Sequence, residues 1–381
     1  MKLLHLADLH LGKRVNGFDL LDDQRFVLEQ ILDLCAARGV DAVALAGDLY
    51  DAPLPPAGAV LLLDWFLTEL AARGIAVLAI AGNHDSAERL DYAARLLARQ
   101  QVYIAGRFTG ALPLVELPDA YGAVQFCLLP FVRTATVRHF LPGADISGYD
   151  SAVAAALATL PPAATGTRRV LLAHQMVTGG GAAPLCAGSE SVAVGAALNV
   201  GTVDAIDAGQ FAGFCYTALG HIHRPQAVGG DCVRYAGAPL CYSLDECGAE
   251  KSAVLITLGP TGAEPELLPL HPRRAMRHLT GPLARLTDPA HLTDTGDYIW
   301  ATLTDDTPVP DAMARLRAAY PNAMKLDYAL RAAAPGPRGA EMIRQKGFGA
   351  LFDDFFAQQQ GRPMTPDEAA ALAELRKEAG E

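Results

Sequence analysis

The chain has no apolar stretch long enough to span a bilayer, because polar residues interrupt even its alanine-rich segments. Its first residues, MKLLHLADLHLG, place one lysine before an apolar run, which loosely imitates a signal peptide. His5, Asp8 and His10 break that run too early for such a signal, so we expect a first β-strand here. These absences predict a protein without membrane contact and a cytoplasmic location.

The sequence also lacks paired cysteines. Its 7 cysteines include no CxxC motif, and their number is odd. Disulfide bonds and a structural zinc site are therefore not expected, and reduced thiols of a cytosolic protein fit best.

Positive charge is scarce as well. The chain has 31 lysines and arginines against 42 aspartates and glutamates, which gives a net charge of -11. This balance argues against a protein that binds nucleic acid by bulk attraction. If the substrate is a polyanion, metal ions or a basic partner must offset the charge locally.

Hydrophobic residues are plentiful, at 51% of 381 residues, which suits two domains or one domain with additions. The first hundred residues alternate between buried strands and helices, a pattern that predicts a parallel sheet with right-handed crossovers. We expect strands over 2–10, 40–48 and 75–85, and helices over 22–39, 55–74 and 86–100, the last capped by Ser86. Shorter strand-like segments follow, and residues 178–201 predict a glycine-rich loop over a functional site.

Near residue 271 the pattern changes to a small strand-helix-strand unit. A linker of the composition AAAPGPRG and two helices come after it. The first of these helices carries an apolar stripe at helical spacing, formed by Phe348, Leu351, Phe352, Phe355 and Phe356. The stripe either packs on the chain's own catalytic part or docks in the groove of a partner.

Residues that can bind metal follow the predicted strands at their carboxyl ends, the edge where open α/β sheets bind ligands. Each short motif is weak evidence alone, since an isolated Asp-x-His is usually a solvated turn. Their joint placement is hard to explain by chance. The candidates are Asp8 and His10 in DLH, Asp48 in GD, Asn83, His84 and Asp85 in GNHD, His174 in LLAHQ, and His221 and His223 in GHIH.

Mixed imidazole and carboxylate ligands suit Mn, Fe or Zn better than Mg or Ca. The set is too large for one ion and natural for two, which form a clamp for phosphoryl transfer. We expect Asp48 to bridge the ions. We expect His84 to act as an acid for the leaving group or as a hydrogen-bond donor to the phosphate, and Asp85 to orient it. Arg224, directly after the last ligand, is a candidate phosphate contact, although a surface role is almost as reasonable.

In this order the motifs resemble the calcineurin-like metallophosphoesterase superfamily. The longer stretches DLHLGK, GDLYDAPLPPAGAV, AGNHDSAERL, SESVAVG and ALGHIHRPQ are similar to the SbcD family, the nuclease subunits of bacterial SbcC–SbcD complexes. The likeness covers about residues 1–270 and continues more loosely towards the C-terminus.

The resemblance implies two packed mixed β-sheets flanked by helices, a small α/β capping domain and a C-terminal helical segment. Its boundaries would be a nuclease domain over 1–270, a capping domain over 271–334, and a linker with partner-docking helices over 335–381. The metal assignment that it implies places Asp8, His10 and His223 on one ion, Asn83, His174 and His221 on the other, Asp48 on both, and His84 as the catalytic histidine.

The activity implied by the resemblance is Mn²⁺-dependent cleavage of DNA, with two Mn²⁺ ions or other divalent transition metals as cofactors. Family members act as 3′→5′ exonucleases on duplex ends and as endonucleases on single strands and hairpins. They work in DNA repair as a homodimer bound to an SbcC-type coiled-coil ATPase, and this favours partner docking for the phenylalanine stripe.

The sequence departs from the family pattern at three positions. The family usually has serine at Ala236 and Ala238, and arginine is common at Ser191. These departures affect only what is expected of substrate positioning. Two alternatives remain open from the residues: a phosphoesterase that acts on a small molecule, and a non-catalytic subunit that tethers an ATPase to DNA. The remaining histidines, His5, His139, His271, His278 and His291, are expected to be structural or solvated.

Overall fold

The computed structural model describes residues 1–187, 205–329 and 364–365. The chain divides into two compact units, Met1–Tyr328 and Ala329–Glu381, and the fold described below is that of the first. The apolar stripe Phe348, Leu351, Phe352, Phe355 and Phe356 lies outside the described residues, as does most of the predicted loop over 178–201. The predicted domain boundaries stay predictions.

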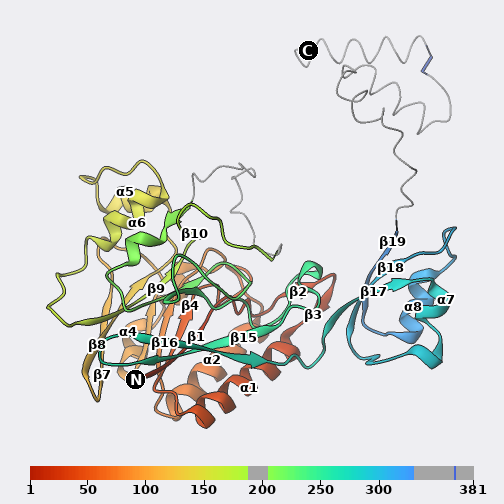
Figure 1. Ribbon diagram of the computed structural model, residues 1–381, viewed down its shortest axis with the longest axis horizontal. Coiled ribbons are helices and arrows are strands. Elements are labelled where there is room, and N and C mark those ends of the chain that lie inside the picture. The colour runs from red at the N-terminus through yellow and green to blue at the C-terminus, as the bar shows by residue number, and fades with distance from the viewer. Residues whose placement is uncertain (188–204, 330–363, 366–381) are drawn as a thin grey trace. The chain divides into compact units, whose positions relative to one another are not determined.

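The first of two large sheets is built around parallel strands from the start of the chain (Figure 1). β1 pairs with β4, β4 with β5 and β5 with β6 in parallel, while β15 and β16 extend the sheet antiparallel beside β1. Its strands, in spatial order, are β16 (Ala263–Leu270), β15 (Lys251–Leu258), β1 (Lys2–Leu6), β4 (Ala42–Ala46), β5 (Ala76–Ile80) and β6 (Val102–Ala105). The strands predicted for the first hundred residues are confirmed.

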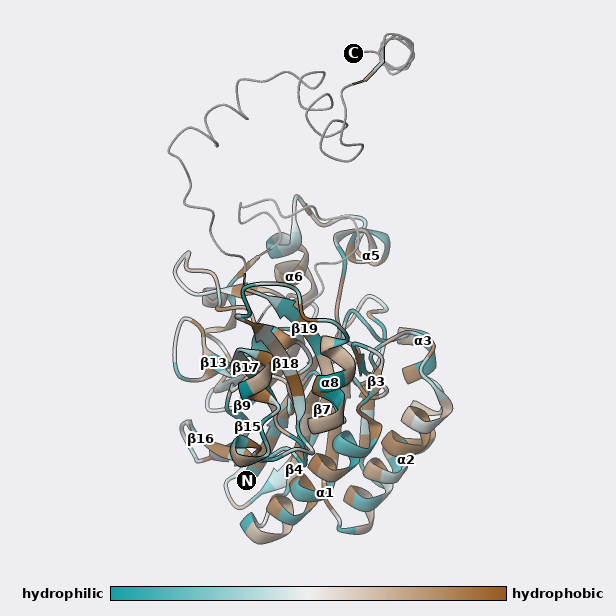
Figure 2. Ribbon diagram, turned by 90° about the vertical axis from the view of Figure 1, so that its right-hand side faces the viewer, coloured by the Kyte–Doolittle hydropathy of each residue, from teal (hydrophilic) through white to brown (hydrophobic). Residues whose placement is uncertain are grey.

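Two long helices, α1 (Leu21–Arg38) and α2 (Ala57–Ala72), cover the outer face of this sheet. In Figure 2 both carry hydrophilic and hydrophobic residues, as expected for helices with one buried face. The prediction of one helix over 86–100 was wrong. The structure has two short helices, α3 (Ala87–Leu90) and α4 (Ala94–Leu97), separated at Ala93 by a left-handed backbone with φ 60°, and Ser86 makes no side-chain capping bond.

The second sheet packs on the first, and its outer face is covered by α5 (Thr134–Phe140) and α6 (Tyr149–Leu157). Figure 1 shows these two helices on the side of the molecule opposite to α1 and α2. Its strands, in spatial order, are β13 (Gln226–Ala227), β14 (Val233–Tyr235), β12 (Tyr216–Gly220), β9 (Arg168–His174), β8 (Gly122–Leu129) and β7 (Leu114–Asp119). Two minor pairs accompany the sheets: β2 (Arg14–Val15) with β3 (Phe18–Asp19), and β10 (Val177–Thr178) with β11 (Ile206–Asp207).

The core between the sheets combines small and large side chains. Ala44 and Ala46 of β4 belong to the same buried cluster as Phe126 of β8 and Leu172 of β9. Strands buried on both faces carry continuous apolar runs instead of alternation, which is why β4 and β5 read as unbroken AVALA and AVLAI. The predicted pair of mixed sheets flanked by helices is confirmed.

A smaller α/β body, here called the capping unit (residues 276–328), follows β16 of the first large sheet along the chain. Its parallel strands lie in the order β17 (Met276–Gly281), β18 (Tyr298–Leu303), β19 (Ala323–Tyr328), and helices α7 (Leu283–Leu286) and α8 (Ala312–Ala319) pack on them. The predicted strand-helix-strand order is confirmed, whereas β17 and α7 were not predicted.

Within the described residues no helix combines the length and the apolar character that crossing a membrane requires.

One ion pair of the second sheet joins the start of β9 to the end of β7, across β8. The Arg168 guanidinium donates to both carboxylate oxygens of Asp119, at 2.8 and 2.6 Å. These hydrogen bonds hold the pKa of Asp119 well below its ordinary value. The carboxylate therefore contributes stability above about pH 4, and this contribution is lost as the pH falls towards the folded-state pKa.

Asp119→Asn is expected to lower the free energy of unfolding by about 2 kcal/mol at neutral pH, the usual worth of a charge-assisted bond. The difference from the wild type should shrink below about pH 4, where the unfolded carboxyl becomes protonated. Urea unfolding at pH 7 and pH 3.5 measures both values, with Asp231→Asn at an exposed position as the control. An equal loss at both pH values would contradict the assignment of the stability to this charge.

Candidate metal centre

The polar residues predicted as ligands converge where the carboxyl ends of strands from both sheets meet. β1, β4 and β5 come from the first sheet, and β9 and β12 from the second. β9 ends in the polar residue His174, and each of the other four strands is followed within a few positions by a polar side chain. The structure brings together Asp8, His10, Asp48, Asn83, His84, His174, His221 and His223.

The loops that carry these side chains have an unusual backbone. Asp8, His10 and Asp48 adopt left-handed φ values of 55°, 43° and 50°, and His221 has φ 98°. Non-glycine residues occupy this region rarely and at an energetic cost, so the surroundings must hold them there. Neighbouring loops do so by backbone hydrogen bonds, from Asp8 N to Gly47 O at 3.0 Å and from His10 N to Asp48 O at 2.9 Å.

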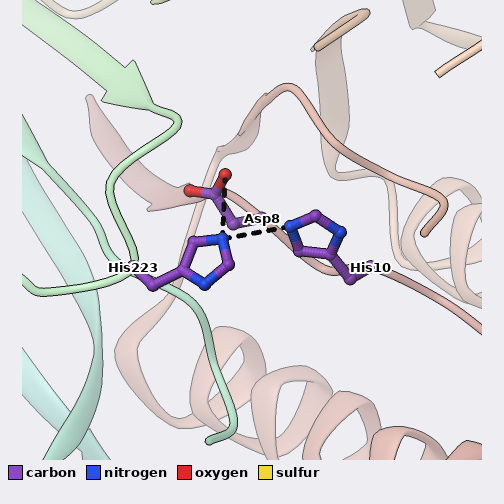
Figure 3. A group of neighbouring side chains, drawn as sticks. All are labelled: Asp8, His10 and His223. Atoms are coloured by element: carbon purple, nitrogen blue, oxygen red, sulfur yellow. Dashed lines mark hydrogen bonds and ion pairs between the residues drawn. The ribbon is translucent and has the colours of Figure 1, made fainter. Parts of the chain in front are cut away.

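The first donor group consists of Asp8, His10 and His223 (Figure 3). The Nε2 atoms of His10 and His223 face each other at 3.1 Å, and His223 Nε2 lies 4.0 Å from Asp8 Oδ1. Both oxygens of Asp8 also accept from the backbone N of His221, at 2.9 and 3.1 Å, which fixes the carboxylate. All three side chains are buried.

The second donor group is built from Asn83, His174 and His221. Asn83 Oδ1 lies 3.1 Å from His174 Nε2 and 3.0 Å from His221 Nδ1. The other ring nitrogen of His174 is hydrogen bonded to the carbonyl of Ala46 at 2.7 Å. Because a carbonyl only accepts, Nδ1 of His174 carries a proton, and Nε2 is the ring atom that faces the centre and would bind an ion in place of a proton.

Asp48 lies between the two groups. Its Oδ2 is 3.2 Å from His174 Nε2 and 3.7 Å from His10 Nε2, while its Oδ1 accepts from the backbone N of His84 at 2.8 Å. Gly82 is packed so closely here that a Cβ would come within 2.1 Å of Asp48 Oδ1. Asp48 therefore lies within reach of both donor groups, and its bridging role stays a prediction.

The chemistry of these donors fits two metal ions. Ligand atoms that share an ion at about 2.1 Å lie roughly 3 Å apart, and the closest contacts within each group have that spacing. Two imidazole nitrogens that face each other across 3.1 Å can share one proton as a hydrogen bond, and the same spacing suits two ligands of one ion.

The ionisation of the centre also favours a bound cation. Burial alone would lower the pKa of His174, yet the carboxylates of Asp48 and Asp8 raise it to about 9. Burial raises the pKa of Asp8, and for Asp48 the adjacent imidazoles outweigh burial and lower the pKa. Burial also lowers the pKa of His221 to about 3, which keeps that ring neutral and able to ligate. The centre therefore attracts a positive charge where a metal ion would lie.

His84 lies beside this cluster. Its backbone N donates to Asp48, and its ring Nδ1 is hydrogen bonded to the carbonyl of Asp51 at 2.9 Å. One ligand atom each of His10, Asp48 and His84 lie within 4.8 Å of one another. This position suits either the predicted proton donor or a further metal ligand.

Asp85 was predicted to orient His84, and this role stays a prediction; the hydrogen bonds described for its carboxylate are to backbone. Its carboxylate accepts from the backbone N of Leu49, Tyr50 and Gly82 at 3.1, 2.9 and 2.9 Å. It therefore ties the loop after β4 to the loop after β5.

Arg224, the predicted phosphate contact, is exposed next to His223 and lines a groove of about 1230 Å³ between the first sheet and the capping unit. Ala236 and Ala238 are buried behind the site, and Ser191 lies outside the described residues.

Supporting residues around His10 and His223 were missed from the sequence. Asp51 Oδ1 lies 3.3 Å from His10 Nδ1, and Gln24 donates to the carbonyls of Leu9 and His10. Lys251 donates to the carbonyl of His223 at 3.3 Å and forms a buried ion pair with Glu246. Asp51 could have been found from the sequence, because it follows the candidate ligand Asp48 by three positions. The other supporting residues lie far along the chain from the ligands that they contact. Among the histidines set aside, His5 is buried and bonded to the Tyr216 hydroxyl at 3.0 Å.

Comparison with known protein families indicates the class of protein to which this site belongs. Residues 1–141 match the family model of the calcineurin-like phosphoesterases. This match supports a metal-dependent phosphoesterase domain in this part of the chain, and the described donor groups are candidate ligands for two divalent ions. Residues 272–360 match the SbcD_C model, described as the Type 5 capsule protein repressor C-terminal domain.

A solved dimetal phosphatase from Danio rerio is 12% identical, with a TM-score of 0.36 over 70% of this chain and 98% of that chain.

Proposed function

We propose that the protein is a Mn²⁺-dependent DNA phosphodiesterase, a 3′→5′ exonuclease on duplex DNA and an endonuclease on single strands and hairpins. It would serve in the cytoplasm as the nuclease subunit of an ATP-dependent DNA-repair complex of the SbcC–SbcD type. The observation that carries the proposal is the combination, in one chain, of a phosphoesterase domain with two donor groups and a C-terminal stretch that matches SbcD_C.

The residues of the centre divide the work. When bound, two divalent ions would activate water and stabilise the charge that develops on a phosphate. The two ions would carry a charge of +4, and the carboxylates of Asp8 and Asp48 would neutralise only two of these charges. The site would therefore stay positive and attract a phosphodiester. Asn83 is a neutral ligand and preserves that surplus. His84 would deliver a proton to the leaving oxygen.

The surroundings of the site support an extended substrate. The groove beside His223 and Arg224 has a volume of about 1230 Å³. Sites for small molecules usually occupy about 300–1,000 Å³. The chain as a whole carries a net charge of -11, so attraction of DNA must come from the ions, from local cations such as Arg224 and from a partner.

Association with a second copy and with a coiled-coil ATPase belongs to the same proposal. Large apolar side chains are exposed around α2 and the α3–α4 segment, where Leu61 is 68% exposed and Leu96 64% exposed. Exposed apolar side chains of this kind support self-association. The apolar stripe over 348–356 is proposed to bind the ATPase, on the strength of its spacing in the sequence alone.

The test is cleavage of a labelled DNA hairpin by the purified full chain, with and without an SbcC-type ATPase. We expect short products with Mn²⁺, none after the metal is removed with EDTA, and no turnover of a phosphomonoester such as p-nitrophenyl phosphate. Hydrolysis of a small phosphoester without DNA cleavage, even with the ATPase present, would replace the nuclease by a small-molecule phosphoesterase. DNA binding without hydrolysis of any substrate would indicate a non-catalytic tether.

A further inference from the structure

Gln24 is a buried amide in the first turns of α1, with 2% of its surface exposed. On an amphipathic helix a glutamine is normally placed on the solvent side, because burying an amide is costly unless its hydrogen bonds are made. The partners of this amide therefore indicate what it is for. All of them belong to two places, the loop after β1 and the Tyr242 hydroxyl.

Every polar atom of the Gln24 side chain is used. Its Nε2 donates to the carbonyl of His10 at 2.7 Å, to the carbonyl of Leu9 at 3.2 Å and to the Tyr242 hydroxyl at 3.2 Å. Its Oε1 accepts from the backbone N of Gly12 at 3.0 Å. The Tyr242 hydroxyl in turn donates to the Leu9 carbonyl. One side chain thus binds three of the four backbone units between 9 and 12.

This loop needs such support. Asp8 and His10 adopt left-handed backbone conformations, and between them Leu9 is buried with 1% of its surface exposed. The left-handed turns direct the flanking Asp8 and His10 side chains into the donor group while Leu9 packs in the core. Neighbouring loop backbone binds one side of the loop, through Gly47, Asp48 and Leu49. Gln24 binds the other side.

We propose that Gln24 is a positioning residue of the metal centre, whose amide holds the strained loop 8–12 so that Asp8 and His10 present their ligand atoms to the first ion. The inference rests on the metal centre of the proposed function and is independent of whether DNA is the substrate. The Gln24 amide makes no hydrogen bond to Asn83, His174 or His221, so we expect its effect to fall mainly on the first ion.

The same helix offers a matched control. The Gln30 side chain also bridges backbone, donating to the carbonyl of His271 at 3.2 Å and accepting from its N at 2.9 Å. Gln24→Met and Gln30→Met thus each remove an amide of α1 that is hydrogen bonded to backbone. Gln24 lies next to the ligand loop, and Gln30 lies away from it.

The experiment titrates the metal-free full chain with Mn²⁺ by calorimetry. The two binding steps are assigned with His10→Ala, which removes a ligand of the first ion, and His174→Ala, which removes one of the second. Gln24→Met is expected to weaken the first step about 10–100-fold, the usual effect of losing a residue that orients a ligand. The second step, and both steps of Gln30→Met, should stay within about twofold of the wild type.

Circular dichroism and thermal unfolding of the metal-free proteins show whether Gln24→Met folds. If it does not, Tyr242→Phe removes the other donor to Leu9 and should weaken the same step in the same direction. Wild-type affinity for both ions in a folded Gln24→Met, or in Tyr242→Phe if the first variant does not fold, would overturn the proposal. Equal weakening of both steps would overturn it too, since that indicates a general structural role. Failure of the nuclease assignment would appear separately, as wild-type metal binding without DNA cleavage.

Discussion

Replacing His84 with alanine is expected to lower kcat for phosphodiester hydrolysis about 10²–10⁴-fold, the usual contribution of a positioned acid or base, and to leave both metal ions bound. The Asp51 carbonyl can only accept, so its hydrogen bond at 2.9 Å fixes the proton on Nδ1 of His84. Proton transfer to the leaving oxygen is thereby assigned to Nε2. The measurement combines single-turnover cleavage of a DNA hairpin with a Mn²⁺ titration.

Two controls make this result specific. His139→Ala removes an exposed histidine on α5 and should behave as the wild type. A hairpin whose scissile phosphate has a leaving group of low pKa needs no proton, so His84→Ala should lose less activity on it. Loss of a metal ion in His84→Ala would instead make His84 a ligand, since it can form a donor group with His10 and Asp48. Unchanged kcat would remove it from the mechanism.

The first strands and the candidate ligands at their carboxyl ends could be predicted from the sequence for a local reason. β4 and β5 are short apolar runs that end in Gly-Asp and Gly-Asn-His, so both the buried strand and the polar residues at its carboxyl end are visible within about ten residues. Parallel strands then place their ends at one edge of a sheet. The structure brings these residues together, and their individual roles stay predictions that the variants test.

The supporting residues could not be found in this way, because their burial depends on contacts between distant parts of the chain. Gln24 and Tyr242 are 218 positions apart and meet only in the folded protein. In a helical pattern Gln24 is indistinguishable from an exposed residue such as Arg25. The break between α3 and α4 has a similar origin. The residues of 86–100 favour a continuous helix, and Ala93 adopts its left-handed backbone against that local preference.

Replacing Asp48 with asparagine is expected to weaken binding of both ions, each by more than about 100-fold, because loss of a ligand exceeds the 10–100-fold effect of losing a residue that orients one. Its Oδ2 lies near His174 of one donor group and His10 of the other. The substitution keeps an oxygen that can accept from the backbone N of His84, so the fold of the loop is preserved while the shared negative charge is removed. Hydrolysis should fall to the background rate.

The matched control for this variant is Asp51→Asn, three positions along the same loop. The Asp51 carboxylate lies 3.3 Å from Nδ1 of His10 and 2.8 Å from Nζ of Lys13, on the side of the ring away from the ions. Its loss should weaken only the first ion, by about 10–100-fold. Mn²⁺ titration of both variants separates the cases, since a shared ligand affects two binding steps and an orienting residue affects one. If Asp48→Asn lost only one ion, Asp48 would be an ordinary ligand of that ion. A group other than Asp48 would then bridge the two ions and balance part of their +4 charge.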